Sequence, residues 1–137
     1  MVAWLLKTEP SVYSYADLVR ESPAEWDGVK NAQAQIHMRA MQVGDTCVIY
    51  HSMTERSAIG VARVVRAPYP DPTDPAGKRV WVDLQAERQL ARPVTLAELK
   101  AEPEFATSEL VRISRLSVQK LTDEQLGIIE RLAASPK

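Results

Sequence analysis

The apolar run Val2–Leu6, with the sequence VAWLL, constrains the fold more than any other segment of the chain. All five side chains are apolar, and the sequence KTEP ends the run. A short unbroken run of this kind predicts a β-strand that is buried on both faces. It is far too short to cross a bilayer, which takes about 20 apolar residues in a helix. We therefore expect a buried strand of a soluble protein with no membrane partner.

Three sequence pairs predict the first turns of short helices. A Ser or Thr followed three residues later by an acidic or amide residue can form a capping box, in which each side chain accepts from the other residue's backbone N–H. The pairs are Ser14 with Asp17, Thr95 with Glu98, and Thr122 with Gln125. In the last of these helices, Leu126, Ile129 and Ala133 share one apolar stripe.

The segment Ala24–Asn31, AEWDGVKN, places a tryptophan in a sequence that is typical of a loop. The polar neighbours of Trp26 leave two roles open for its ring, a wall of a binding pocket or a cap on the core. Asn31 is suited to cap a helix that runs to about Met41. The expected apolar face of that helix consists of Ala32, Ile36 and Ala40.

Four segments read as further strands: Thr46–His51, Ala58–Arg66, Val80–Glu87 and Arg115–Gln119. The first two should pair as a hairpin, and the third alternates apolar and polar residues, so one of its faces is wet. Between the second and third, Ala67–Lys78 contains four prolines and predicts a stiff loop.

Short strands flanked by short helices predict an α+β fold, a small curled mixed sheet or β-barrel decorated by short α-helices. The 137 residues, of which 45% are hydrophobic, suit one domain over residues 1–137 with a single core. Lys and Arg total 17 against 18 for Asp and Glu, which excludes nucleic-acid binding by bulk charge. The single cysteine, Cys47, cannot form an intramolecular disulfide, so we expect a reducing cytoplasm.

Taken together, these segments resemble the EVE domain, a PUA-like family related to the YTH readers of methylated adenine. Seven stretches match in chain order over nearly the whole chain, which is much more specific than any single motif. They are WLLKTEP (Trp4–Pro10), WDGVKN (Trp26–Asn31), GD with VIYHS (Gly44–Ser52), GVARVV (Gly60–Val65), YPDPT (Tyr69–Thr73), RPVTLAELK (Arg92–Lys100) and RLSVQ (Arg115–Gln119).

The resemblance implies a PUA-like barrel with a pocket for one modified base, from DNA, from RNA or from a free modified nucleotide. Such a reader needs a ring to stack on, groups that bond the base edge, and cations for phosphate. Trp26 or Tyr50 would stack the base, which is worth about 1–3 kcal/mol. The other candidates are Lys7, Lys30 and Arg39 for phosphate, Asn31, Ser52, Ser117 and Gln119 for the base edge, and Thr8 and His51 as further binding residues. We expect a monomer with no cofactor and no metal.

The chain departs from the family pattern beside this expected pocket. After Asn31 the pattern continues with Tyr and then Gln-Ala-Arg-Asn, where this chain has Ala32, Gln35 and Ile36 at the Tyr, Arg and Asn positions. Met53 replaces the usual Asn after His-Ser. These changes leave the expected fold intact but allow a different ligand or weaker binding.

Two other functions stay open at this point. Lys7, Thr8 and Glu9 could serve a small hydrolase acting on a modified nucleoside, because amidohydrolases of the PUA-like ASCH family use Lys, Thr and Glu in another arrangement. A protein-interaction domain would instead require an exposed apolar patch. His51 beside Ser52 does not form a catalytic couple, because neighbouring strand residues point to opposite faces.

Overall fold

The computed structural model describes residues 2–113 and 115–135. Within this part, six strands form one mixed sheet in the order β2-β5-β4-β3-β1-β6. β1 and β3 are parallel, and the other neighbouring pairs are antiparallel. The strands are β1 (Ala3–Thr8), β2 (Ala24–Trp26), β3 (Thr46–His51), β4 (Ser57–Pro70), β5 (Val80–Thr95) and β6 (Val118–Leu121).

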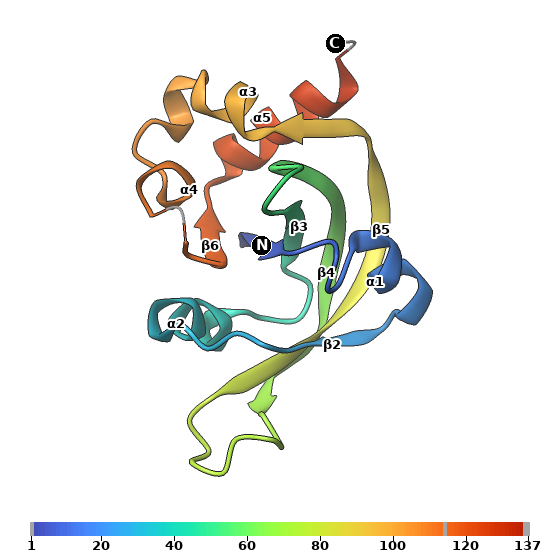
Figure 1. Cartoon of the computed structure of the whole chain (residues 1–137), viewed down its shortest axis with the longest axis vertical. Helices are drawn as coiled ribbons and strands as arrows, with labels where there is room; N and C mark the ends of the chain where they lie inside the picture. The colour runs from blue at the N-terminus through green and yellow to red at the C-terminus, as the bar shows by residue number, and fades with distance from the viewer. Residues whose placement is uncertain (1, 114, 136–137) are drawn as a thin grey trace.

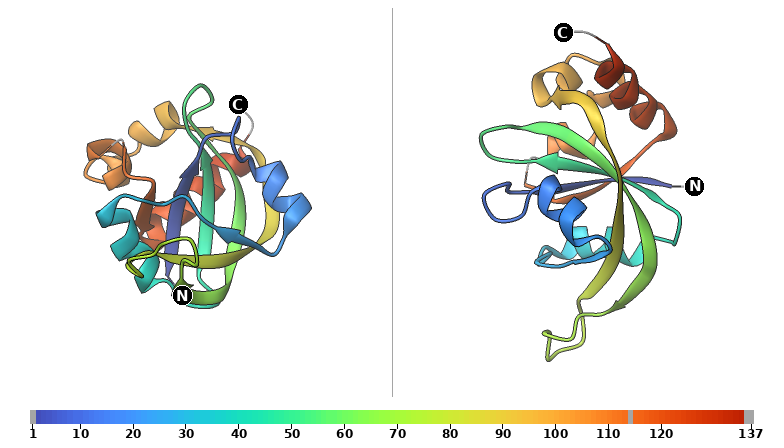
Figure 2. Two further views of the ribbon diagram at one scale, coloured as in Figure 1. Left: turned by 60° about the horizontal axis from the view of Figure 1, so that its bottom comes forward. Right: turned by 90° about the vertical axis from the view of Figure 1, so that its right-hand side faces the viewer.

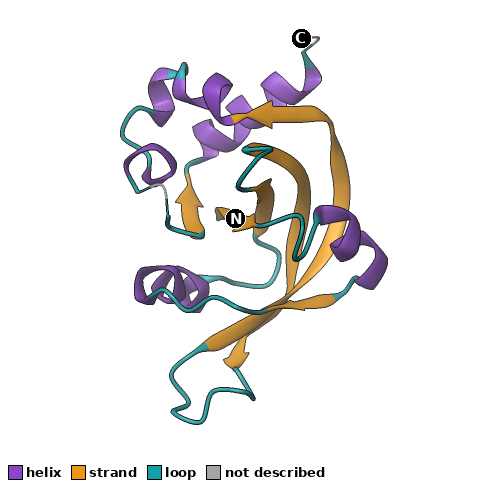
Figure 3. Ribbon diagram, viewed as in Figure 1, coloured by secondary structure: helices purple, strands orange, loops and turns teal. Residues whose placement is uncertain are grey.

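The long strands β4 and β5 bend strongly, so the sheet curls into a half-barrel (Figure 1). Short helices lie outside it, with α3, α4 and α5 gathered at one end (Figure 3). The helices are α1 (Tyr15–Glu21), α2 (Ala32–Ala40), α3 (Leu96–Lys100), the 3-10 turn η1 (Pro103–Phe105), α4 (Glu109–Arg112) and α5 (Asp123–Ala134). This arrangement confirms the predicted α+β fold with a curled mixed sheet.

β1 lies between β3 and β6 and is buried on both faces, as the VAWLL run predicts. Its alternate residues enter two different hydrophobic clusters. Trp4 and Leu6 pack with the side chains of α1, α2 and β2. Ala3 and Leu5 pack with those of α3, α4 and α5. The sheet therefore separates two cores, one on each face.

All three predicted capping boxes are present, and the helices begin where the boxes place them. Asn31 also caps α2, because its side-chain oxygen accepts from the backbone N–H of Ala34. The predicted apolar face of α2 is wrong: Ile36 is 55% exposed, whereas Gln35 is 3% exposed. The buried side chains are Ala34, Gln35 and Met38.

Several strand boundaries also differ from the prediction, and β5 continues to Thr95 where the alternation predicted an end at Glu87. Ala24–Trp26 is a short edge strand paired with β5, not a loop. β4 continues to Pro70, so the loop that the prolines stiffen is shorter than predicted and joins the tips of a long β4–β5 ribbon, which extends past the rest of the sheet (Figure 2). The last strand begins at Val118 and ends at Leu121, three residues later than expected at its start.

Within the described residues, no helix is long and apolar enough to cross a membrane. No group of three or more His, Cys, Asp or Glu side chains is placed there to hold a metal ion. Cys47 is fully buried, and burial raises the pKa of its thiol, so it is not a reactive group.

Candidate functional site

A pocket of about 400 Å³ lies beside the two edge strands of the curled sheet. Residues of β2 and Ser117, which directly precedes β6, both line it, so the curl brings the two edges of the sheet to one place. This volume is typical of small-molecule sites. We call it the acidic pocket, and its lining residues are Lys7, Glu9, Val12, Tyr13, Glu21, Ala24, Glu25, Trp26, Asp27, Gly28, Val29 and Ser117.

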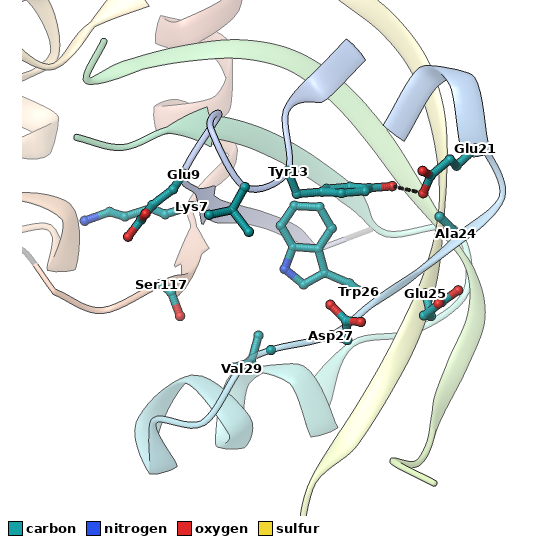
Figure 4. Close-up of a pocket in the computed structure, with 12 residues that line it drawn as sticks. Lys7, Glu9, Tyr13, Glu21, Ala24, Glu25, Trp26, Asp27, Val29 and Ser117 are labelled. Atoms are coloured by element: carbon teal, nitrogen blue, oxygen red, sulfur yellow. Dashed lines mark hydrogen bonds between the residues drawn. The ribbon is translucent and has the colours of Figure 1, made fainter. Parts of the chain in front are cut away.

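Two aromatic rings form one wall of the acidic pocket. Trp26 is 5% exposed, and Tyr13 meets its ring edge to face with the centroids 6.0 Å apart. The Tyr13 hydroxyl donates to Glu21 at 3.0 Å, and burial together with this bond raises the pKa of Tyr13. The indole nitrogen of Trp26 faces the hollow toward Ser117 and Val29 (Figure 4). It has no hydrogen-bond partner among the described residues, so it is a donor available to a ligand.

Carboxyl groups dominate the polar lining of this pocket. Glu9, Glu21, Glu25 and Asp27 line it, against the single cation Lys7. Burial, with a smaller contribution from the charge of Glu25, raises the pKa of Asp27. The pocket is therefore suited to a neutral ligand that presents N–H donors, not to an anion.

Gln35 supports the floor of the acidic pocket from α2. Its amide nitrogen donates to the carbonyl of Val29 at 2.8 Å, and its oxygen accepts from the backbone N–H of Val80 at 2.9 Å. One buried amide thus joins the pocket loop to the start of β5. This role explains why an amide, and not the apolar Ile36, occupies the inner face of α2.

A second pocket, of about 490 Å³, lies on the opposite face of β1. We call it the cationic pocket, and its lining residues are Lys7, Tyr50, Ser52, Met53, Arg56, Leu96, Lys100, Leu110 and Arg115. Lys7 borders both pockets. Its Nζ lies 5.7 Å from the centroid of the Tyr50 ring, and burial lowers the pKa of the Lys7 ammonium.

The structure separates the predicted site residues into several places. Lys7, Trp26 and Ser117 line the acidic pocket, whereas Tyr50 and Ser52 line the cationic one. The expectation that one pocket brings the Trp26 and Tyr50 segments together is wrong. The two rings belong to the cores on opposite faces of the sheet.

Other predicted residues form internal contacts. The Thr8 hydroxyl donates to the carbonyl of Tyr13 at 2.7 Å, and the buried Gln119 donates to the carbonyl of Leu116 at 3.0 Å. Arg39 donates to the carbonyl of Lys78 at 2.8 Å. Their hydrogen-bonding groups thus serve the fold.

Two predicted residues of the α2 entrance have their own places. Asn31 uses its side-chain oxygen as the cap of α2. Lys30 lines a separate shallow pocket with Asp71, Arg79 and Trp81. Neither residue lines the acidic pocket.

His51 is 6% exposed and holds the start of α1. The backbone N–H of Tyr15 donates to its Nε2 at 3.0 Å, so Nε2 must be unprotonated, and Nδ1 lies 3.1 Å from a carboxylate oxygen of Glu55. Both ring nitrogens of His51 therefore have partners within the protein, so its position is explained without a ligand. It lines a third recess beside Tyr15, which none of the other predicted site residues lines.

Lys7, Thr8 and Glu9 do not form the arrangement that the hydrolase hypothesis needs. Adjacent strand residues point to opposite faces, and the Thr8 hydroxyl is already bonded to the Tyr13 carbonyl. The sequence reasoning also missed Tyr13, Glu25 and Asp27 as lining residues. The sequence did contain a signal for Glu25 and Asp27, because both directly flank Trp26 in AEWDG.

The EVE-domain family model matches residues 2–132. The chain belongs to the EVE-domain family. Human thymocyte nuclear protein 1 is 34% identical to this chain, over 92% of this chain and 71% of the human protein. The sequence resemblance is thereby confirmed.

Solved structures agree with this family membership. A protein of Rhodopseudomonas palustris, solved by NMR, has 43% identity and a TM-score of 0.91, covering 97% of this chain and 93% of its own. Human THYN1, crystallised in complex with 5-methylcytosine-containing DNA, has 29% identity and a TM-score of 0.89 over the full length of both chains. The half-barrel and its flanking helices are thus shared across the family.

Proposed function

We propose that this EVE domain reads DNA by taking one 5-methylcytosine base into the acidic pocket. The observation that carries the proposal is the lining itself, an aromatic wall and several carboxyl groups at the meeting of the two sheet edges. The human relative bound to 5-methylcytosine-containing DNA supports the choice of ligand. A base must leave the helical stack to enter such a pocket.

The chemistry of the lining favours cytosine over thymine. Cytosine presents an amino group at N4, and carboxylates are the usual acceptors for it. Thymine presents a carbonyl oxygen at the same position, which would face the carboxylates without a donor. Glu25 and Asp27 flank Trp26 in the sequence and line the pocket, so their carboxyl oxygens are acceptors beside the aromatic wall.

Two further groups complete the reading of the base. The indole N–H of Trp26 and the hydroxyl of Ser117 can donate to the O2 and N3 acceptors of cytosine. The 5-methyl group then meets the apolar side chains of Val12 and Val29. Each base-specific contact of this kind discriminates by about 1–3 kcal/mol.

The test is a titration, followed by fluorescence anisotropy, of matched single-stranded and duplex oligonucleotides that carry 5-methylcytosine, cytosine or thymine at one position. We expect the methylated cytosine to bind tightest and thymine weakest. An RNA of the same sequence and the free nucleoside are included, to test whether the protein takes the base from DNA. The samples are checked for any altered base, because a reader returns its ligand unchanged.

A matched pair of variants connects the selectivity to the acidic pocket. Trp26→Phe removes the N–H but keeps a ring, and we expect about fivefold weaker binding of the methylated oligonucleotide, as for one lost hydrogen bond. Trp81→Phe is the control, because Trp81 meets Tyr69 in the same edge-to-face geometry, 6.3 Å apart, in the β4–β5 ribbon. Equal affinity for methylated cytosine and thymine, or identical behaviour of the two variants, would refute the proposal.

A further inference from the structure

The cationic pocket concentrates positive charge in a chain whose net charge is -1. Four basic side chains line it, from β1, the β3–β4 turn, α3 and the segment before β6: Lys7, Arg56, Lys100 and Arg115. No acidic residue is among its lining residues. The pocket is thus the electrostatic opposite of the acidic pocket on the other face of β1.

Three of these cations lack an acidic partner. In the described part of the chain, no carboxylate lies within 4.0 Å of Arg56, Lys100 or Arg115. Some arginines elsewhere, such as Arg92 with Glu98, are ion-paired. Cations that share a pocket repel one another, so their convergence without carboxylates favours an anionic ligand.

Tyr50 adds a hydrogen-bond donor to the cationic pocket. The residue is 3% exposed, it lines the cationic pocket, and its hydroxyl has no hydrogen-bond partner in the described chain. Burial raises the pKa of Tyr50 to about 12, so the hydroxyl remains a donor at neutral pH. The hydroxyl is thus a donor beside the four cations, and an anionic ligand in the pocket can accept from it.

The turn between β3 and β4 holds Arg56 at the rim. Met53 and Arg56 have positive φ angles of 70° and 45°, which residues other than glycine rarely adopt. The Arg56 Nε donates to the Met53 carbonyl at 3.0 Å and fixes the turn. The other guanidinium nitrogens of Arg56 are left to bond a ligand.

We propose that the cationic pocket binds a phosphoryl group of the nucleic acid whose base occupies the acidic pocket. The inference rests on the proposed function, because Lys7 borders both pockets and a nucleotide places its phosphate next to its base. Ammonium, guanidinium and hydroxyl groups are the usual phosphate donors in such complexes. The source is either a backbone phosphodiester or a terminal phosphate.

The test measures DNA binding of Arg56→Gln, Lys100→Gln and Arg115→Gln against salt concentration. All three side chains belong to exposed residues, and the one bond lost, from Arg56 to Met53, lies in the β3–β4 turn, so the overall fold should be retained. Each variant should bind methylated and unmethylated oligonucleotides more weakly by the same factor, and should reduce the slope of log affinity against log salt by about 0.7–0.9. Arg63→Gln is the matched control, an exposed arginine of β4 that lines neither pocket.

Tyr50→Phe tests the hydroxyl donor, with an expected loss of affinity of about tenfold, as for a hydrogen bond to a charged group. Oligonucleotides with one neutral methylphosphonate beside the modified base, or with and without a 5′-phosphate, identify the source. Loss of affinity with the methylphosphonate indicates a phosphodiester, and loss without the 5′-phosphate indicates a terminal one. Either result supports the site if the affinity of the cationic-pocket variants does not fall further when the same phosphate is neutralised or removed.

The inference fails if the three glutamine variants behave like Arg63→Gln. This failure is distinct from failure of the proposed function. A protein that binds phosphate through these residues but shows no preference among the three bases would retain the phosphate site and lose the base-reading role.

Discussion

Gly60 of β4 lies directly under the ring of Tyr15, the first residue of α1. A Cβ atom at Gly60 would be 2.4–2.6 Å from three ring carbons of Tyr15. Carbon atoms in good contact are about 3.5–4.0 Å apart, so the ring would have to retreat by about 1 Å. Gly60→Ala would therefore place a methyl group where there is no space for it.

The retreat is opposed at both ends of Tyr15. Its hydroxyl donates to the Val61 carbonyl at 2.9 Å, and its backbone N–H donates to His51 at 3.0 Å. Overpacking of this kind costs about 1–3 kcal/mol, and loss of the hydroxyl bond adds about 1 kcal/mol. We expect Gly60→Ala to lower the free energy of unfolding by about 2–4 kcal/mol, which is a fall in Tm of roughly 8–16 °C.

Urea denaturation followed by tryptophan fluorescence measures this change. Gly127→Ala is the control, because a Cβ at this exposed position in α5 meets nothing within 4 Å and alanine is the better helix former by about 1 kcal/mol. Tyr15→Leu removes the ring carbons that make the contact. If Gly60→Ala costs as much in the Tyr15→Leu background as in wild type, the clash is not the cause and the reasoning is wrong.

Three further predictions concern polar contacts of single side chains. Asp45→Ala removes the acceptor for the Trp4 indole N–H at 3.0 Å and should cost about 2–4 kcal/mol in urea unfolding, more than Asp45→Asn, which keeps an oxygen; equal costs would contradict the role of that oxygen. His51→Ala leaves the Tyr15 N–H without an acceptor, so hydrogen exchange at that amide should accelerate, and unchanged exchange would refute the contact. Hydrogen bonds from the Arg92 guanidinium lower the pKa of Glu98 from 4.5 to about 2. The contribution of Glu98 to the free energy of unfolding is therefore complete above pH 4.5 and is lost as the pH falls toward 2. The difference in stability between wild type and Glu98→Gln should shrink over that range, and a constant difference would count against the coupling.

Local signals in the sequence predicted much of the fold because their causes are local. The capping boxes act within three residues, and the β1 run reports burial on two faces through composition alone. The short strand Ala24–Trp26 was missed because it is a strand only through its pairing with β5. A pairing with a distant strand leaves no recognisable pattern in a segment of only three residues.

The α2 face was predicted wrongly for a different reason. A hydrophobic pattern places Ile36 inside, but Gln35 occupies that face because its amide bonds backbone groups of two distant segments, at Val29 and Val80. A buried side chain that satisfies backbone groups can outweigh an apolar one. The partners of Gln35 can be known only from the tertiary structure.

The candidate site was predicted in part. The neighbours of Trp26 indicated a pocket, and the ring does line one. Strand alternation, however, puts Lys7 and Tyr50 on the face of the sheet opposite to Trp26. The pairing of β1 with β3 places these two residues directly beside each other. The sequence could not reveal this division, because it depends on which strands become neighbours in the curled sheet.

The position of β1 inside the sheet has a consequence for synthesis of the protein. β1 leaves the ribosome before either neighbour, and β6 follows it by more than 100 residues. At about 5–20 residues per second, β1 waits on the order of 5–20 s with one hydrogen-bonding edge unpaired. An apolar strand in that state can pair with another chain. The nascent chain should therefore be at greatest risk of aggregation, and of capture by chaperones, until its last strand has emerged.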